Sequence, residues 1–220
     1  PEPVCNCEDQ CGAYEYDKNC PVCVTDYKLC TYKKPNVSIK IRQPEEWHND
    51  IVSVSFSVKD TADTGNFEIA KVEAKVGQNG SWIDVTEEKK LRISENCTVY
   101  VLVTDQKGNT YERSRTIRCF DTTKPTLNAA VSDGLLSIQV HDTDSGAKAV
   151  YVNGYEFTDL TGGTLNIRLQ QFDAGYEYFT ISAMDNAGNM SEVYKTKNPY
   201  YKDSADTSDG NPAEQLPESA

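Results

Sequence analysis

The sequence predicts an all-β protein in which two tandem β-sandwich domains follow a small cysteine-rich, disulfide-stapled head. Three observations predict it. Apolar and polar residues alternate along several short stretches, and no stretch shows a convincing helical period. Two successive zones carry the same hairpin signal, D-x-x-G-N, at 105–109 and at 185–189. Finally, six of the eight cysteines are crowded into residues 5–30.

The head, residues 1–34, has the spacing C-x-C-x3-C-x8-C-x2-C-x6-C and no periodic apolar face. A polar segment this short cannot build a core, so cross-links must hold it together. We expect six cysteines paired among themselves, in a connectivity that the spacing does not decide: Cys5, Cys7, Cys11, Cys20, Cys23 and Cys30.

Two other uses of these cysteines stay open. A zinc ion would take Cys5 and Cys7 together with Cys20 and Cys23, because short cysteine pairs can present two thiolates to one ion. A thioredoxin-like redox pair at 20–23 would need an α/β unit, and nothing in the sequence supplies one. Disulfides are the preferred hypothesis because they use all six cysteines and suit an exported chain.

Residues 35–121 contain about seven short strand patterns, the number typical of one antiparallel sandwich. The clearest is 52–58, where Val52, Val54, Phe56 and Val58 alternate with serine and lysine. The other predicted strands cover 37–42, 72–76, 81–84, 90–93, 98–104 and 110–118.

Residues 122–198 repeat this organisation, with strand patterns at 136–140, 165–169 and 179–183. Each zone carries an Asp/Gly turn after its second strand, KDTADTG at 59–65 and HDTDSG at 141–146. The two zones are therefore predicted to be a tandem repeat of one domain type. Residues 199–220 are acidic and contain proline, so we expect a disordered linker there.

Cys97 and Cys119 are equally distant in sequence from Gly108, the centre assumed for the first D-x-x-G-N hairpin. Each cysteine is an even number of residues away from the apolar residues of its strand, so its side chain should point to the same face as theirs. We therefore expect them to oppose each other across the hairpin and to form a disulfide.

The acidic turns raise a calcium alternative. Asp142, Asp144 and Asp185 are its best candidates, because carboxylate oxygens are the ligands that calcium prefers. Each turn alone offers one or two carboxylates, and Asp, Gly and Asn are also what tight turns require. The preferred prediction is turns without a metal or a cofactor.

Composition and charge exclude several functions. The net charge of −12 disfavours nucleic acid and anionic lipid as partners. No stretch approaches the roughly 18 consecutive apolar residues of a membrane span. His48 and His141 are the only histidines, they lie in different zones, and neither has a nucleophile motif beside it, so we expect no enzyme. The even cysteine count predicts an extracellular, cell-surface location.

The D-x-x-G-N hairpin followed by DTTKP at 121–125 resembles the junction between tandem bacterial Ig-like domains. The whole order of head, repeats and acidic tail is similar to exported cell-surface proteins of conjugative mobile elements in gut Firmicutes. This resemblance implies a Gram-positive cell-surface setting and anchoring through a C-terminal region beyond the tail. It implies no known activity and no catalytic residues.

These observations predict a non-catalytic extracellular protein, an adhesion or protein- or glycan-binding stalk that displays the cysteine-rich knob. We expect a monomer. The alternatives are a carbohydrate-binding accessory region of a larger surface enzyme, and a head that binds zinc.

Overall fold

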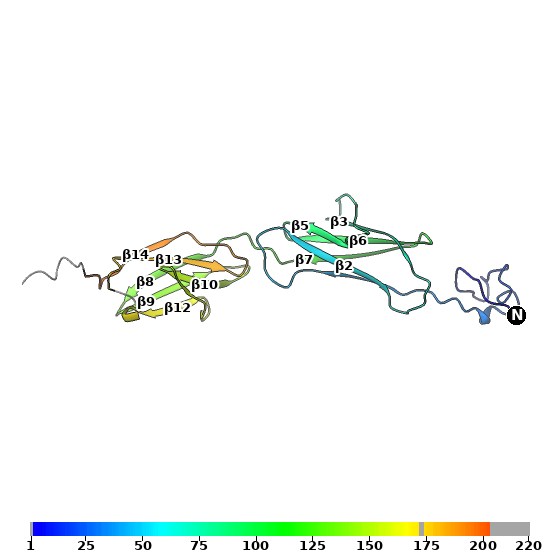
Figure 1. Cartoon of the computed structure of the whole chain (residues 1–220), viewed down its shortest axis with the longest axis horizontal. Helices are drawn as coiled ribbons and strands as arrows, with labels where there is room; N and C mark the ends of the chain where they lie inside the picture. Colours follow the sequence, from blue (N-terminus) through cyan, green and yellow to red (C-terminus); the bar gives the residue numbers. More distant parts are fainter. Residues whose placement is uncertain (1, 172–173, 203–220) are drawn as a thin grey trace, which may run out of the picture. The chain divides into compact units, whose positions relative to one another are not determined.

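The computed structural model describes residues 2–171 and 174–202, and most of its ordered elements are β-strands (Figure 1). In this part of the chain the only helical elements are two 3-10 turns, Tyr27–Leu29 (η1) and Leu169–Gln171 (η2). The all-β prediction is confirmed. No described helix has the length and apolar character needed to cross a membrane. The acidic linker predicted from residue 199 falls, from residue 203 onward, outside the described residues.

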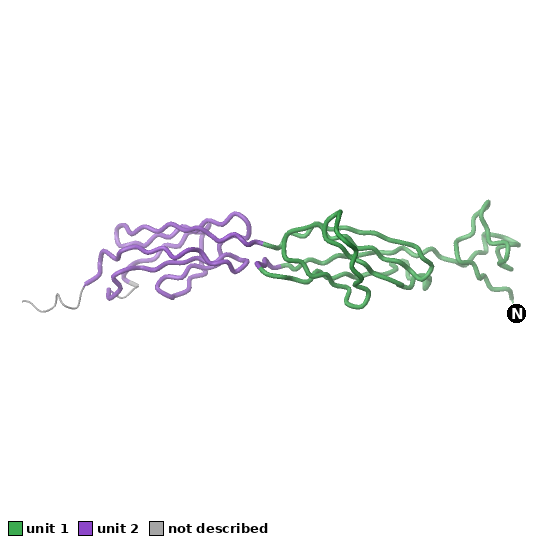
Figure 2. The backbone as a smooth tube through the Cα atoms, turned by 90° about the horizontal axis from the view of Figure 1, so that it is seen from above, with its two compact units in different colours: residues 1–45, 50–120 green, residues 46–49, 121–220 purple. Residues whose placement is uncertain are grey.

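The chain divides into two compact units, residues 1–45 with 50–120 and residues 46–49 with 121–220 (Figure 2). Unit 1 contains the head and a sandwich of two antiparallel sheets, in the orders β1-β2-β5 and β4-β3-β6-β7. Its strands are Val37–Arg42 (β1), Val52–Asp60 (β2), Ile69–Val76 (β3), Ile83–Asp84 (β4), Lys90–Ile93 (β5), Cys97–Asp105 (β6) and Thr110–Ile117 (β7). Every strand predicted for this zone is present.

The core of this sandwich follows the period-two pattern of its strands. On β6, Val99, Val101 and Val103 are fully buried, while the residues between them are only partly buried. On β2, Val54 and Phe56 face the same core. The alternation arises because successive side chains of a strand point to opposite faces of the sheet.

The sandwich of unit 2 has the same strand order as that of unit 1. Its first, second and fifth strands form one sheet, β12-β9-β8, and its fourth, third, sixth and seventh form the other, β11-β10-β13-β14. The strands are Thr126–Ser132 (β8), Leu135–His141 (β9), Ala147–Val152 (β10), Tyr155–Phe157 (β11), Thr164–Arg168 (β12), Tyr178–Asp185 (β13) and Tyr194–Lys197 (β14). Sequence patterns predicted only β9, β12 and β13.

Two tight hairpin turns account for strands that the patterns missed. Asp133 and Gly134 join β8 to β9 with φ of 52° and 71°, and Asn153 and Gly154 join β10 to β11 with φ of 49° and 87°. Two positive φ values in a two-residue loop define the turn whose twist matches the flanking strands. Asp-Gly and Asn-Gly are the pairs that tolerate this conformation, so both turns could have been read from the sequence.

The head has no strand in its described residues 2–34. Short backbone turns shape it, such as the bonds from the N–H groups of Val24 and Asp26 to the carbonyls of Cys20 and Val22. Its buried apolar side chains are Cys20 and Cys23. Sulfur atoms therefore occupy the interior that apolar side chains fill in the sandwiches.

Candidate functional site

The six head cysteines converge on one place. Their Sγ atoms form two groups of four, and within each group all sulfurs lie within 4.8 Å of one another. The first group is Cys5, Cys7, Cys20 and Cys23, the set that sequence spacing assigned to zinc. The second group is Cys7, Cys11, Cys23 and Cys30.

Backbone N–H groups point at the outer sulfurs of this cluster. Cys11 donates its N–H to the Sγ of Cys30 at 3.4 Å, and the Sγ of Cys11 accepts the N–H of Asp17 at 3.4 Å. The N–H groups of Cys7 and Thr31 lower the pKa of Cys5 to about 5. Such donors stabilise a thiolate, the form of cysteine that binds metals.

The central sulfurs are in a different environment. Burial raises the pKa of Cys7, and the neighbouring thiols of Cys23 and Cys11 raise it further. Burial likewise raises the pKa of Cys23. Without a compensating charge, these two thiols stay protonated at neutral pH.

All eight cysteines carry free thiols in the structure. The shortest sulfur–sulfur distance recorded in the head is 3.2 Å, between Cys7 and Cys23, against about 2.05 Å for a disulfide bond. The disulfide pairings of the head stay a prediction.

The predicted opposition of Cys97 and Cys119 is wrong by two residues. Cys97 lies opposite Ile117, and Thr104 opposite Thr110, so the hairpin is centred on Lys107 rather than on Gly108. The reason is the turn itself, which closes through the bond from the N–H of Asp105 to the carbonyl of Asn109.

Cys119 lies beyond the end of β7. Asn96 holds this segment in place, since its Oδ1 accepts the N–H groups of Cys119 and Phe120. Burial raises the pKa of both Cys97 and Cys119, which makes them poor nucleophiles. Their disulfide stays a prediction.

Of the calcium candidates, the structure brings Asp142 and Asp185 together but not Asp144. Their third partner is Asp121, and one carboxylate oxygen from each lies within 4.8 Å of the others. Asp121 belongs to the DTTKP motif, and sequence reasoning missed it as a site residue. Asp121 and Asp185 are buried, and the buried Oδ2 of Asp142 has no hydrogen-bond partner among the described residues.

Most of these carboxylates accept hydrogen bonds within their own turns, and this accounts for their presence without a metal. Asn189 donates its N–H and its Nδ2 to the two oxygens of Asp185, at 2.8 and 2.7 Å. Asn109 donates to Asp105 in the same way. Burial raises the pKa of Asp105, but its hydrogen bonds from Asn109, Tyr111 and Lys107 outweigh burial and lower it. The calcium alternative stays a prediction.

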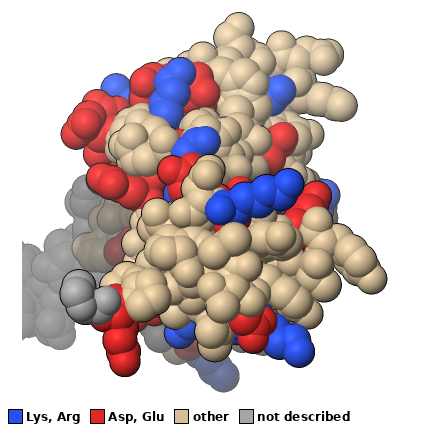
Figure 3. All heavy atoms as spheres, turned by 90° about the vertical axis from the view of Figure 1, so that its right-hand side faces the viewer, with Lys and Arg blue, Asp and Glu red and all other residues tan. Residues whose placement is uncertain are grey.

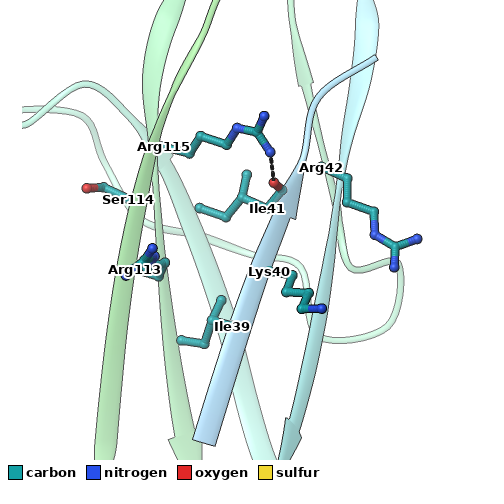
Figure 4. A pocket seen from close by; sticks show the side chains of 7 residues that line it. All are labelled: Ile39, Lys40, Ile41, Arg42, Arg113, Ser114 and Arg115. Atoms are coloured by element: carbon teal, nitrogen blue, oxygen red, sulfur yellow. Dashed lines mark hydrogen bonds between the residues drawn. The ribbon is translucent and has the colours of Figure 1, made fainter. Parts of the chain in front are cut away.

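A groove of about 440 Å³ follows the seam of sandwich 1 between β1 and β7 (Figure 4). Each is an edge strand of its sheet, and no ladder joins the two in the described residues. The side chains of Ile39 and Ile41 point toward the gap, whereas those of Lys40 and Arg42 point away from β7. Arg115 crosses the seam and donates to the carbonyl of Ile41 at 2.7 Å.

The lining of this groove carries four cations and no carboxylate: Lys40, Arg42, Arg113 and Arg115, with Ile39, Ile41 and Ser114 between them. None of the four takes part in the two ion pairs of the described residues. A concentration of unpaired positive charge is unexpected in a chain with net charge −12. Sequence analysis missed the groove because it depends on two strands far apart in the chain.

The two histidines lie on loops or strand ends of unit 2. His48 accepts the N–H of Asp121 through its backbone carbonyl, and His141 is exposed at the end of β9.

No protein-family model and no curated protein matches this chain. Solved structures do match. The fibronectin(III)-like modules of Clostridium thermocellum CbhA share 13% identity at a TM-score of 0.42, over 72% of this chain and 91% of that one.

Two further matches come from larger proteins. A domain structure of a 1.5-MDa bacterial ice-binding adhesin shares 15% identity at a TM-score of 0.39, over 75% of this chain and 64% of that one. A Bacteroides ovatus protein, SGBP-B, in complex with a mixed-linkage heptasaccharide shares 13% identity at a TM-score of 0.28, over 75% and 48%.

Proposed function

We propose that this protein is a non-catalytic extracellular binding protein whose β1–β7 groove takes an extended, acidic segment of a partner protein. The observation that supports this proposal is the groove itself. Four cations and two isoleucines line it, between two strand edges that no ladder joins. The sandwiches serve as rigid carriers of this surface and of the cysteine-rich head. A cell-surface setting of the kind implied by the resemblance fits such a role.

Each part of the groove matches a feature of the proposed ligand. Edge strands offer backbone N–H and C=O groups with which an extended peptide can add a strand. Ile39 and Ile41 supply an apolar floor for alternate side chains. Arg113 on β7 supplies positive charge for carboxylates, and Lys40 and Arg42 supply it on the side of β1 that faces away from β7. A glycan would use the charge but not the strand edges, so we favour a protein segment.

Binding of synthetic peptides to the full chain tests this proposal. The probe is a fluorescent decapeptide that alternates Glu with Val, and its Lys-for-Glu counterpart is the negative control. We expect the acidic peptide alone to bind, and the triple variant Lys40→Ala, Arg42→Ala, Arg113→Ala to weaken it at least tenfold. Arg115 is left intact because it bonds to β1.

The matched control removes two exposed cations from β5, by the substitutions Lys90→Ala and Arg92→Ala. This variant should bind the acidic peptide as the unmodified chain does. Equal loss in both variants would mean unspecific charge attraction. Binding of a sulfated polysaccharide such as heparin, without binding of the peptide, would replace the protein ligand by an anionic glycan.

A further inference from the structure

The head cysteines are arranged as two four-sulfur groups that share one edge. Cys7 and Cys23 belong to both groups, and each group is completed by two further cysteines of its own. A disulfide requires only that sulfurs approach in pairs. Three disulfides therefore do not explain why four sulfurs at a time lie within mutual reach.

We propose that the head binds two zinc ions in one thiolate cluster, with two bridging and four terminal cysteines. The bridges are Cys7 and Cys23. The terminal ligands are Cys5 and Cys20 on one ion and Cys11 and Cys30 on the other. Two tetrahedral ions need eight ligand positions, and six thiolates fill them when two are shared.

The sulfur distances within each group fit this arrangement, and Cys5 and Cys30, which belong to different groups, also lie 3.9 Å apart. With Zn–S bonds of about 2.3 Å, tetrahedral geometry places ligand sulfurs about 3.8 Å apart. Cys5 and Cys23, in one group, are 3.8 Å apart, and Cys7 and Cys11, in the other, are 3.4 Å apart. The shared edge from Cys7 to Cys23 is the shortest at 3.2 Å. Cys7 and Cys23 would be the two sulfurs that hold both ions.

Hydrogen bonding separates the same two classes of sulfur. Among the terminal cysteines, the Sγ atoms of Cys11, Cys20 and Cys30 each accept a backbone N–H. For Cys7 and Cys23, the recorded partners of Sγ in the described part of the chain are other sulfurs. A terminal thiolate binds one metal ion and keeps lone pairs that can accept N–H donors. A bridging thiolate would use a further lone pair to bind the second ion, so fewer would be available to such donors. The backbone thus acts as the outer shell that orients metal ligands.

A single zinc ion explains less. The zinc alternative from the sequence, made of the first group alone, leaves Cys11 and Cys30 unused, although they lie within the same 4.8 Å of the shared sulfurs as the others do. Soft thiolate donors in a tetrahedral set select zinc among the common divalent ions. Binding releases the protons of the six thiols and leaves a cluster with two negative charges, which the N–H donors stabilise.

Metal analysis of the full chain, purified without added reductant or chelator, tests the proposal. We expect about two zinc ions per chain and, after denaturation with chelator, alkylation of all six head cysteines. One zinc per chain overturns the shared cluster. Six paired head cysteines without metal overturn it in favour of the disulfide prediction, and iron or copper at this ratio overturns the choice of metal.

Variants separate bridges from terminal ligands. Cys20→Ser removes a ligand from one ion only, so about one zinc should remain. Cys7→Ser removes a ligand from both ions, so less than one should remain. Cys119→Ser, outside the head, is the matched control and should keep both ions. Equal losses from Cys7→Ser and Cys20→Ser contradict the shared edge.

Titration with Co²⁺ gives a second measurement that needs no variant. The thiolate-to-cobalt absorption of the reduced chain should rise until two equivalents have been added, and a plateau at one equivalent contradicts the proposal. Peptide binding to the β1–β7 groove is measured separately, so failure of either proposal leaves the other standing.

Discussion

Single carboxylates determine the shape of several loops in both sandwiches. Asp60, at the end of β2, accepts the N–H groups of Asn36, Ala62 and Thr64, and Asp105 and Asp185 each close a D-x-x-G-N turn. In these irregular loops the backbone N–H groups lack carbonyl partners, and the carboxylates accept their hydrogen bonds instead. Part of the aspartate content of this acidic chain therefore serves to hold loops in shape.

The pH dependence of stability should reveal this role at Asp60. Hydrogen bonds from Thr64, Asn36 and Ala62 lower its pKa from 3.8 to about 2. A lowered folded-state pKa contributes stability that is present above the unfolded pKa, and this stability is lost as pH falls from about 4 to about 2. Asp60→Asn should lower the melting temperature at pH 7, and the difference should vanish near pH 2.

Asp63→Asn is the control for that experiment. Asp63 is exposed and has a φ of 48°, a conformation that asparagine also tolerates. Its melting temperature should match that of the unmodified chain at every pH. A difference between Asp60→Asn and the unmodified chain that persists unchanged at pH 2 would show that the carboxylate charge is not responsible.

The cluster of Asp121, Asp142 and Asp185 allows a test of the calcium alternative. Asp142 accepts the N–H groups of Asp144 and Gly146, so in chelator Asp142→Asn should destabilise unit 2 by about 1 kcal/mol, or lower its melting temperature by about 4 °C. We expect added Ca²⁺ to leave the unmodified chain unchanged. Stabilisation of the unmodified chain but not of Asp142→Asn by Ca²⁺ would make this cluster a calcium site.

At the scale of elements, hairpin turns decide which strands pair and in what register. The β6–β7 turn places Cys97 opposite Ile117, so a shift of its centre by one residue moved the cysteine pair by two. In unit 2, the turns at Asp133-Gly134 and Asn153-Gly154 pair β8 with the predicted β9 and β10 with β11, and so place three strands that the sequence patterns missed. Register follows from turn geometry more directly than from side-chain pattern.

The β10–β11 turn offers a direct test of this dependence. Gly154 has a φ of 87° and open space around its Cα, so an added Cβ meets only backbone strain. Gly154→Ala should destabilise unit 2 by about 1 kcal/mol in chemical denaturation. Gly154→Asn should cost less, since asparagine tolerates positive φ, and equal losses would mean that side-chain volume rather than φ is responsible.

At the scale of the whole molecule, charge is negative in sum but locally mixed. Acidic and basic side chains are interspersed on the face shown in Figure 3, and the seam of sandwich 1 is cationic although the net charge is −12. Net charge is a sum over the whole chain, so it does not reveal a local cationic surface such as this groove.

Salt should act on the groove and on the fold in different ways. Because the cations of the groove are exposed and unpaired, raising ionic strength from about 0.05 to about 0.5 M should weaken binding of the acidic decapeptide by about tenfold or more. The melting temperature should change little, since burial of apolar side chains holds the sandwiches. Binding that is insensitive to salt would show that the cations contribute nothing.

The sequence by itself determined the all-β class, the seven strands of the first sandwich and the recurrence of its hairpin, because period-two burial and Asp/Gly turns are local signals. Tertiary structure alone decided what depends on distant residues meeting. It placed Asp121 beside Asp142 and Asp185, brought β1 against β7 to form a cationic groove, and made Cys7 and Cys23 common to two four-sulfur groups. Spacing along a chain shows which cysteines are neighbours in sequence, and only the folded backbone shows which sulfurs two ions could share.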